Sequence, residues 1–438
     1  MVNHESLLAE DLKHIWHPCT QMKDLATNPP LIVHGAKGSY LYTDRGPIID
    51  GISSWWCKSL GHGFPAVINA INEQLSTFEH VLGAGTTYSK LVQLGIRLSE
   101  ISGLQHLFFA SDGACAVEIA MKLVLHANQK KGFSTRNQFI ALKNSYHGET
   151  LATLSVSDLG LYKQPFRDLG PSCHFLQNIP YVLNEEDPLW HDCSLVWEAA
   201  LKELEAIKEN VCALIIEPLI QGAGGMLIYS RDFLRKLRAW TEENQIYLIA
   251  DEIMTGFGRT GQWLACHHAN ITPDLICISK GLTSGTLPLS CVLIDSAIYD
   301  LFYHDVADGQ SFLHSHTYSG NPLAVSAALQ TIETMTSLHI NQRAKELGRL
   351  MHQYFKEIAR ESGKIHHVRT LGAMVAGDLE TRANDPRIGY RLHLEAQKKG
   401  ALLRPLGNTL YWLPPLTTEP HTIEQLADIT LAAIKAIY

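Results

Sequence analysis

The chain has 438 residues, which is enough for a large core and for more than one domain. Apolar residues make up 46% of it and charged residues 18%, as is typical of a water-soluble globular protein. The formal net charge of −8 argues against nucleic acid or an anionic membrane surface as the main partner.

The N-terminal residues, the lengths of the apolar runs and the cysteine usage all bear on the cellular compartment. The first residues, "MVNHESLLAEDLKHIWHPCT", contain early acids and no apolar stretch of the signal-peptide kind. No apolar run approaches the roughly 20 residues that a membrane span needs. The nine cysteines form no C-x-x-C pair, and an odd number in a chain of this length suggests reduced thiols. The sequence therefore predicts a cytoplasmic protein.

Hydrophobic patterning predicts an α/β fold. Near the N-terminus, "LIVHGA", "GSYLYTD" and "PIIDGI" read as short strands separated by turns. From about residue 64, short apolar strands alternate with amphipathic helices, for example "HLFFA" before "ACAVEIAMKLVLHANQKK". This alternation predicts a mostly parallel sheet with helices on both faces.

The C-terminal part has a different pattern. A long helical stretch follows "NPLAV" and continues to about residue 360, after which strands and helices complete a smaller α+β unit. Neither this part nor the N-terminal strands has an obvious separate core, so we expect them to join. The predicted domains are an N-terminal segment of the small domain (1–63), a large domain (64–329) and the C-terminal small domain (330–438).

Two charged residues end apolar strands in the large domain. Asp251 follows "IYLIA" and Lys280 follows "DLICIS", so neighbouring strands of an open α/β sheet could present both to one crevice. A lysine can form a Schiff base with an aldehyde, and a carboxylate can pair with a protonated pyridine nitrogen. Alone, Asp251 could be a loop cap and Lys280 a solvated charge. Together they favour a pyridine cofactor.

Two further stretches suit such a cofactor. Gly113 and Ala114 open a helix after the strand "HLFFA", where small residues and free backbone N–H groups could hold a phosphate. Tyr146 and His147 follow the strand "QFIAL", where an aromatic ring could stack on a planar ligand, although a tyrosine there could equally cover the sheet edge.

Two other sequence patterns raise the question of a dinucleotide site or a metal site, and neither is well supported. "GFGRTG" (256–261) matches the dinucleotide pattern G-x-G-x-x-G, but two acids precede it and no clear helix follows, so a nicotinamide-dependent oxidoreductase is the weaker alternative. The histidine-rich "CHHAN" and "FLHSHTY" have no partner cluster at zinc-like spacing, and no metal is expected.

The stretch "LIADEIMTGFGRTG…PDLICISKGLTSG" resembles the signature of class III pyridoxal-phosphate aminotransferases, which have the fold-type I architecture. The similarity runs from "HPCT" to the end of the chain. Within that family, "DGISSWWCKSLGHG" and "LLRPLGNTLYWLPP" resemble the adenosylmethionine–8-amino-7-oxononanoate aminotransferases of biotin synthesis.

The resemblance implies a role for individual residues. Lys280 matches the Schiff-base lysine, Asp251 the partner of the pyridine nitrogen and Tyr146 the ring-stacking tyrosine. Further matches are Gly113 and Ala114 in the phosphate cup, Thr317 with His316 as a phosphate contact from a second subunit, and Trp55, Ser315 and Arg404 at substrate-contacting positions. The resemblance thus implies pyridoxal 5′-phosphate as cofactor, S-adenosylmethionine and 8-amino-7-oxononanoate as substrates, and a homodimer.

Two departures and one geometric constraint qualify these matches. Cys19 stands where the family usually has a substrate-recognising tyrosine, and Ala114 where it usually has serine. Because of Cys19, another class III enzyme that takes its amino group from lysine or an ω-amino acid stays an alternative. Trp55 and Trp56 are expected on a strand, where adjacent side chains face opposite ways, so at most one of them would line the pocket.

Overall fold

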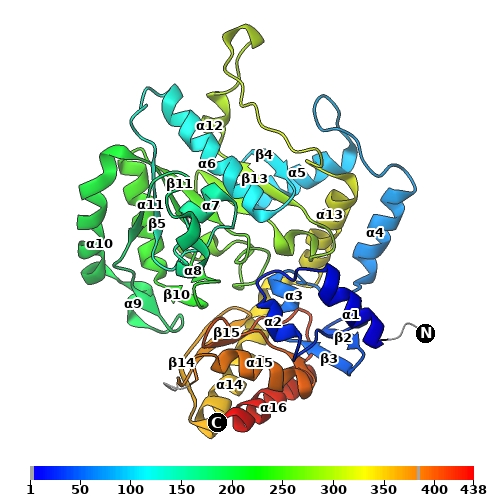
Figure 1. Ribbon diagram of the computed structural model, residues 1–438. Coiled ribbons are helices and arrows are strands. Elements are labelled where there is room, and N and C mark those ends of the chain that lie inside the picture. The colour runs from blue at the N-terminus through cyan, green and yellow to red at the C-terminus, as the bar shows by residue number, and fades with distance from the viewer. Residues whose placement is uncertain (1–3, 382–384) are drawn as a thin grey trace.

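A seven-stranded sheet forms the centre of the computed structural model, which describes residues 4–381 and 385–438 (Figure 1). In spatial order its strands are β4 (His106–Ala110), β13 (Ser290–Ile294), β12 (Leu275–Ile278), β11 (Tyr247–Asp251), β8 (Val211–Ile216), β5 (Gln138–Leu142) and β6 (Cys173–Leu176). β13 runs antiparallel to both neighbours, and all other pairs are parallel. The predicted mostly parallel sheet is confirmed.

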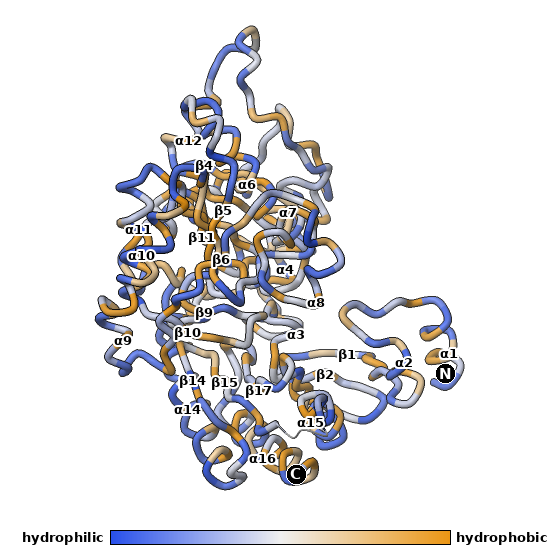
Figure 2. Tube along the Cα trace, turned by 60° about the vertical axis from the view of Figure 1, so that its left-hand side comes forward, coloured by the Kyte–Doolittle hydropathy of each residue, from blue (hydrophilic) through white to orange (hydrophobic). Residues whose placement is uncertain are grey.

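Burial on both faces explains why these strands are apolar runs and not alternating patterns. In β11, Leu248 and Ala250 belong to clusters on one side of the sheet, whereas Tyr247 and Ile249 pack with α6 (Gly113–Lys130) on the other. The hydropathy colouring shows this concentration of apolar residues along the central strands (Figure 2). The charged Asp251 at the end of β11 is an exception to this apolar pattern, and interactions with its neighbours must stabilise it there.

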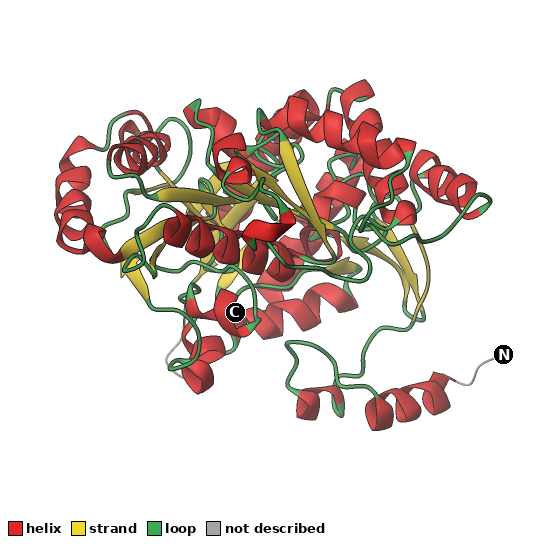
Figure 3. Cartoon of the chain, turned by 90° about the horizontal axis from the view of Figure 1, so that it is seen from above, coloured by secondary structure: helices red, strands yellow, loops and turns green. Residues whose placement is uncertain are grey.

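Helices cover the sheet from both sides (Figure 3). Besides α6, this part of the chain contains α4 (Pro65–Leu75), α5 (Ser89–Ser102), α7 (Leu151–Ser155), α8 (Gly160–Lys163), α9 (Pro188–His191), α10 (Ser194–Ile207), α11 (Arg231–Glu243), α12 (Ser296–Asp300) and α13 (Pro322–Ser337). A small sheet adds β7 (Tyr181–Val182), β10 (Leu227–Tyr229) and β9 (Ile220–Gln221). Turns of 3₁₀ helix occupy Gln164–Phe166, Lys208–Asn210, Ala265–Ala269, Lys280–Thr283 and Val306–Asp308.

The two ends of the chain meet in a smaller part of the molecule. One sheet has the order β1 (Val33–Lys37), β2 (Tyr40–Thr43), β3 (Gly46–Asp50) and β16 (Ala401–Leu402), so that C-terminal Ala401 pairs with Ile49. A second sheet joins β14 (Ile365–Leu371), β15 (Met374–Leu379) and β17 (Thr409–Trp412). The C-terminal helices of this smaller part are α14 (Ile340–Ser362), α15 (Ile388–Lys398) and α16 (Pro420–Ile437). Before the N-terminal strands come α1 (His4–His14) and α2 (Met22–Leu25), and after them comes α3 (Ser53–Trp56). The domain boundaries at residues 63 and 329 stay a prediction.

Close backbone packing in this smaller part makes one helical glycine irreplaceable. A Cβ added to Gly348 in α14 would lie 1.8 Å from the carbonyl oxygen of Gly372. We expect Gly348→Ala to lower the melting temperature by at least about 3 °C, because backbone atoms cannot move aside cheaply. Gly95 in α5 is the matched control, since its added Cβ would lie 3.9 Å from Leu107 and alanine favours a helix. Equal melting temperatures of the two variants would contradict the packing described.

Candidate active site

A cavity of about 610 Å³ opens at the carboxyl ends of β11 and β12. Parallel strands β11 and β12 are paired so that Asp251 stands opposite Cys277, three residues before Lys280. The strand ends therefore bring the predicted carboxylate and amine to one cavity. The predicted residues that line it are Cys19, Trp55, Gly113, Ala114, Tyr146, Asp251 and Lys280.

Asp251 is buried and held in a fixed orientation. His147 Nδ1 donates to its Oδ2 at 2.8 Å, and the backbone N–H of Ile253 donates to its Oδ1 at 3.2 Å. His147 Nε2 is buried and has no hydrogen-bond partner among the described residues. The two bonds explain how a carboxylate is retained at the end of an apolar strand. The sequence pattern locates His147 after the strand that ends at Leu142, next to Tyr146, but does not predict its bond to Asp251.

Lys280 extends its amine toward the aromatic wall of the cavity. Its Nζ lies 4.7 Å from the centre of the Trp56 ring, and no hydrogen bond from Nζ is found among the described residues. Burial lowers the pKa of Lys280, although Asp251 and Glu217 nearby oppose the shift. A lysine with a lowered pKa has a larger neutral fraction at neutral pH and is a better nucleophile and base.

Glu217, which lines the cavity, connects the loop of Tyr146 to the backbone of Gly222. Its Oε2 accepts from the Tyr146 backbone N–H and its Oε1 from that of Gly222, both at 2.9 Å. Burial, with a smaller contribution from Asp251, raises the pKa of Glu217 to about 7, while His147 and the two N–H groups act against this. Tyr146 donates its hydroxyl to Glu149 at 3.0 Å, so both ends of this tyrosine are fixed.

The first turn of α6 offers a cradle for an anion. Asp112 caps this 18-residue helix by accepting from the N–H of Cys115 at 3.0 Å. A Cβ on Gly113 would lie 2.9 Å from Ile253 Cδ1, so glycine lets the first turn of α6 pack closely against Ile253, which also lines the cavity. Ala114 also lines the cavity and has no side-chain donor. Backbone N–H groups and the helix dipole are what a phosphate would find here.

Both tryptophans line the cavity, contrary to the expectation that at most one would. Residues 53–56 are not a strand but a short helical turn in the left-handed region, with φ of +72° at Trp55 and +73° at Trp56. In such a turn consecutive side chains do not alternate between two faces. The left-handed region costs roughly 1–2 kcal/mol per non-glycine residue, so hydrogen bonds elsewhere must maintain it.

The two indoles contact different parts of the site. Trp56 is buried and donates its Nε1–H to the hydroxyl of Tyr411 at 3.0 Å. Trp55 is partly exposed, and the Arg404 guanidinium lies 4.9 Å from its ring centre. Arg404 Nη2 donates to the backbone carbonyl of Cys19 at 2.8 Å. The Trp56 ring thus lies beside the amine of Lys280, and the Trp55 ring lies beside the guanidinium of Arg404.

Space for a long substrate continues from the central cavity. An adjoining cavity of about 710 Å³ shares Trp55, Trp56, Tyr146 and Lys280 with it and reaches Tyr162. Arg404 itself lines a third cavity, of about 520 Å³, together with Cys19. Arg404 is therefore beside the central cavity and not in its wall.

Three predicted site residues lie outside all of these cavities in the single chain. Ser315, His316 and Thr317 belong to the segment between α12 and α13, which extends from the body at the top of Figure 1. Ser315 and Thr317 are exposed, and His316 Nε2 lies 3.0 Å from His314 Nε2. The structure does not bring them to Lys280 of the same chain.

A family model described as "Aminotransferase class-III" matches residues 22–434. The chain belongs to the class III aminotransferase family. Among the similar proteins are two that are named adenosylmethionine-8-amino-7-oxononanoate aminotransferase. The one from Helicobacter pylori is 36% identical, with 94% of this chain and 93% of the relative covered, and the one from Synechococcus elongatus is 37% identical, with 94% and 96% covered.

Two solved structures are similar to this chain over nearly its whole length. The adenosylmethionine-8-amino-7-oxononanoate aminotransferase of Methanocaldococcus jannaschii has a TM-score of 0.91 at 30% identity, covering 99% of each chain. An amine transaminase from an uncultivated Pseudomonas species, solved with pyridoxal phosphate bound, has a TM-score of 0.89 at 28% identity, covering 97% and 99%. The predicted family, fold and cofactor are confirmed. Within the described residues, no helix has the length and apolar character of a membrane span, and no cluster of three potential metal ligands is found.

The raised pKa of Glu217 predicts a pH-dependent stability. Between the usual value of 4.5 and about 7, the folded protein retains a proton that the unfolded chain has released, so stability falls as the pH rises through this window. Glu217→Gln removes this effect. We therefore expect the melting temperature of the wild type, relative to Glu217→Gln, to be higher at pH 5 than at pH 8.

Glu333, which is exposed in α13, provides the control. Glu333→Gln should show no comparable change between the two pH values. A difference between the wild type and Glu217→Gln that is independent of pH would contradict the shifted pKa.

Proposed function

We propose that this chain transfers the amino group of S-adenosylmethionine to 8-amino-7-oxononanoate and so makes 7,8-diaminononanoate for biotin synthesis. The observation that carries the proposal is the convergence of Lys280 and Asp251 at two adjacent strand ends, beside a tryptophan pair and an arginine. The names of the relatives described above support the same substrates.

The residues present fit pyridoxal phosphate, which when bound supplies an aldehyde that condenses with amines and a ring that withdraws electrons from the neighbouring carbon. Asp251, oriented by His147, would pair with a protonated ring nitrogen. Gly113 and Ala114 would hold the phosphate through backbone N–H groups, and Tyr146 would cover the ring. The buried Nε2 of His147, which has no hydrogen-bond partner among the described residues, agrees with this arrangement.

Lys280 has two roles in the proposed reaction. As a neutral amine its Nζ would be the group that bonds the cofactor aldehyde, and as a free amine Nζ would accept a proton from the α-carbon of the amino donor. Its lowered pKa favours both roles, because a charged ammonium has no lone pair. The Trp56 indole, whose ring centre is 4.7 Å from Nζ, gives this amine an apolar neighbour.

Arg404 is proposed to bind the distal carboxylate of the keto acid. One guanidinium nitrogen is engaged by the Cys19 carbonyl, and Trp55 supports the plane of the group. The remaining N–H donors suit a carboxylate. Cys19 accepts the hydrogen bond from Arg404 through its backbone carbonyl, so the replacement of tyrosine by cysteine does not remove this bond. The replacement changes only the side chain, which we propose faces the donor substrate.

The assembly is proposed to be a homodimer in the cytoplasm. Ser315, His316 and Thr317 lie on a segment away from their own cavity, so they would serve the site of a second subunit, as the family resemblance implies. The cytoplasmic location rests on the nine cysteines, an odd number.

Lys280→Ala should abolish turnover. The variant loses both nucleophile and proton acceptor, so kcat should fall by on the order of a thousandfold or more. The measurement is formation of 7,8-diaminononanoate with both substrates in excess, on protein shown to retain the wild-type melting temperature. Full activity would remove Lys280 from its assigned role.

Arg404→Ala should affect the two substrates unequally. Loss of a charge-assisted hydrogen-bond pair predicts a KM for 8-amino-7-oxononanoate that is about 10 to 100 times higher, with little change for S-adenosylmethionine. Arg404→Lys, which keeps the charge but not the forked geometry, should lie between the variant and the wild type. An equal rise of both KM values would count against the carboxylate role.

A further inference from the structure

The left-handed turn that carries the two tryptophans requires an explanation of its own. Four consecutive residues have positive φ, namely Ser53 (+51°), Ser54 (+45°), Trp55 (+72°) and Trp56 (+73°), and none is glycine. Side chains disfavour this conformation, so it persists only where the surroundings impose it. The turn directly precedes Cys57, which also lines the central cavity.

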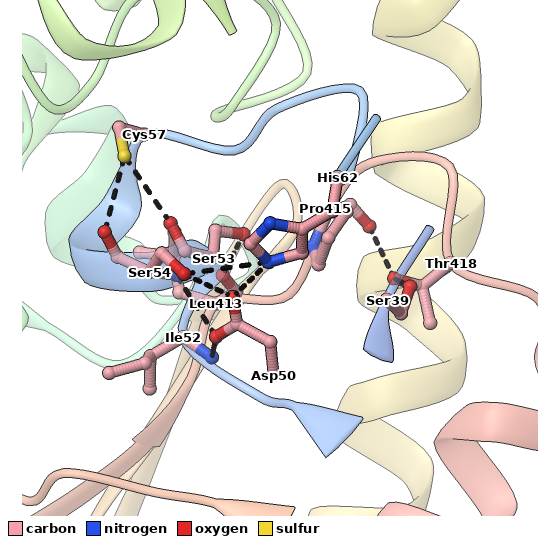
Figure 4. A network of polar contacts seen from close by, with 10 residues as sticks. All are labelled: Ser39, Asp50, Ile52, Ser53, Ser54, Cys57, His62, Leu413, Pro415 and Thr418. Atoms are coloured by element: carbon pink, nitrogen blue, oxygen red, sulfur yellow. Dashed lines mark hydrogen bonds and ion pairs between the residues drawn. The ribbon is translucent and has the colours of Figure 1, made fainter. Parts of the chain in front are cut away.

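Asp50, at the end of β3, is the main support of this turn (Figure 4). Its Oδ1 accepts from the backbone N–H of Ser54 at 2.9 Å and of Ile52 at 3.3 Å, and its Oδ2 accepts from the Ser54 hydroxyl at 2.7 Å. The carboxylate is completely buried. Burial alone would raise the pKa of Asp50, but the bonds from His62 and Ser54 outweigh it and lower the pKa, so the group stays an acceptor.

His62 completes the network from another segment. Its Nε2 donates to Asp50 Oδ2 at 2.8 Å and lies 3.5 Å from the Ser54 hydroxyl. The backbone of His62 is itself fixed, because its N–H and C=O exchange hydrogen bonds of 2.8 and 2.9 Å with Gly38. The imidazole therefore holds the second carboxylate oxygen against the turn.

The turn has direct consequences for the cavity. It places the Trp56 ring 4.7 Å from Lys280 Nζ and the Trp55 ring 4.9 Å from the Arg404 guanidinium. Loosening of residues 53–56 would move both indoles at once. Neither Asp50 nor His62 lines the cavity, so any influence on the reaction passes through the turn.

We propose that Asp50 and His62 are positioning residues of this active site, which hold residues 53–56 in the left-handed conformation and thereby set Trp55 against Arg404 and Trp56 against Lys280. Only the choice of the keto acid as a probe rests on the proposed function. The conformational part can be tested without any substrate.

The substrate-free test uses the thiol of Cys57, which donates to the Ser54 carbonyl at 3.2 Å. Alkylation by iodoacetamide of the pyridoxal-phosphate-loaded protein is followed at each cysteine by peptide mass spectrometry. In His62→Leu, the rate at Cys57 should rise about tenfold, because a lost buried hydrogen bond favours local opening. The rate at half-buried Cys173 in β6 should stay unchanged and serves as the internal reference.

Two further variants separate the proposed role from general destabilisation. His62→Gln retains a donor at the position of Nε2 and should restore Cys57 labelling to near the wild-type rate. Ser39→Ala removes a different buried hydrogen bond nearby, from Ser39 to Thr418 at 2.7 Å, and should leave the rate at Cys57 unchanged (Figure 4). Asp50→Asn replaces one acceptor oxygen by a donor and should behave like His62→Leu.

Kinetics provide the second arm. In His62→Leu, the KM for 8-amino-7-oxononanoate should rise about tenfold, as expected for a displaced Trp55–Arg404 contact, and His62→Gln should reverse most of this rise. Ser39→Ala should keep the wild-type KM.

Unchanged labelling of Cys57 in both His62→Leu and Asp50→Asn would overturn the proposal, as would a parallel rise at Cys57 and Cys173. Altered labelling at Cys57 alone, in an enzyme that does not turn over this keto acid, would refute the proposed function and leave the positioning role standing.

Discussion

The parallel register of β11 and β12 determines where the two central groups of this site, Asp251 and Lys280, lie. Because Asp251 stands opposite Cys277, the chain leaves both strands at the same edge of the sheet and brings Lys280 to the same cavity as the carboxylate. Both strands are buried on both faces, and Asp251 is itself buried at the end of β11. An amine whose pKa is lowered by burial and a carboxylate oriented by histidine are thus consequences of sheet geometry.

The rest of the site is assembled by segments that only the complete fold brings together. The turn with Trp55 comes from the N-terminal part, Arg404 from the C-terminal part and Tyr146 from the loop after β5. The sheet that pairs β3 with β16 holds the first two in contact, and the hydrogen bond from Arg404 to Cys19 adds a second connection. The groups proposed to bind the substrate therefore depend on the junction of the two chain ends, whereas those proposed to bind the cofactor lie around the large sheet.

The sequence was informative where chemistry coincides with a strand end. Asp251, Lys280 and the helix start at Gly113 could be placed because apolar runs stop abruptly at them, and the alternation of strands and helices predicts the parallel sheet. The turn of Trp55 could not be predicted, since its left-handed conformation depends on Asp50 and His62 and not on local propensity. The bonds of Glu217 and His147 were equally inaccessible, because they join residues about 70 and 100 positions apart.

The most direct test is a visible absorption spectrum of the purified, pyridoxal-phosphate-loaded protein, before and after S-adenosylmethionine is added without keto acid. The account predicts a yellow absorption band that bleaches on this addition, since Lys280 would be displaced and the amino group retained on the protein-bound cofactor. A band that ignores S-adenosylmethionine and bleaches with lysine would contradict the proposed donor. Absence of any band after reconstitution would contradict the assignment of Asp251 and Lys280 themselves.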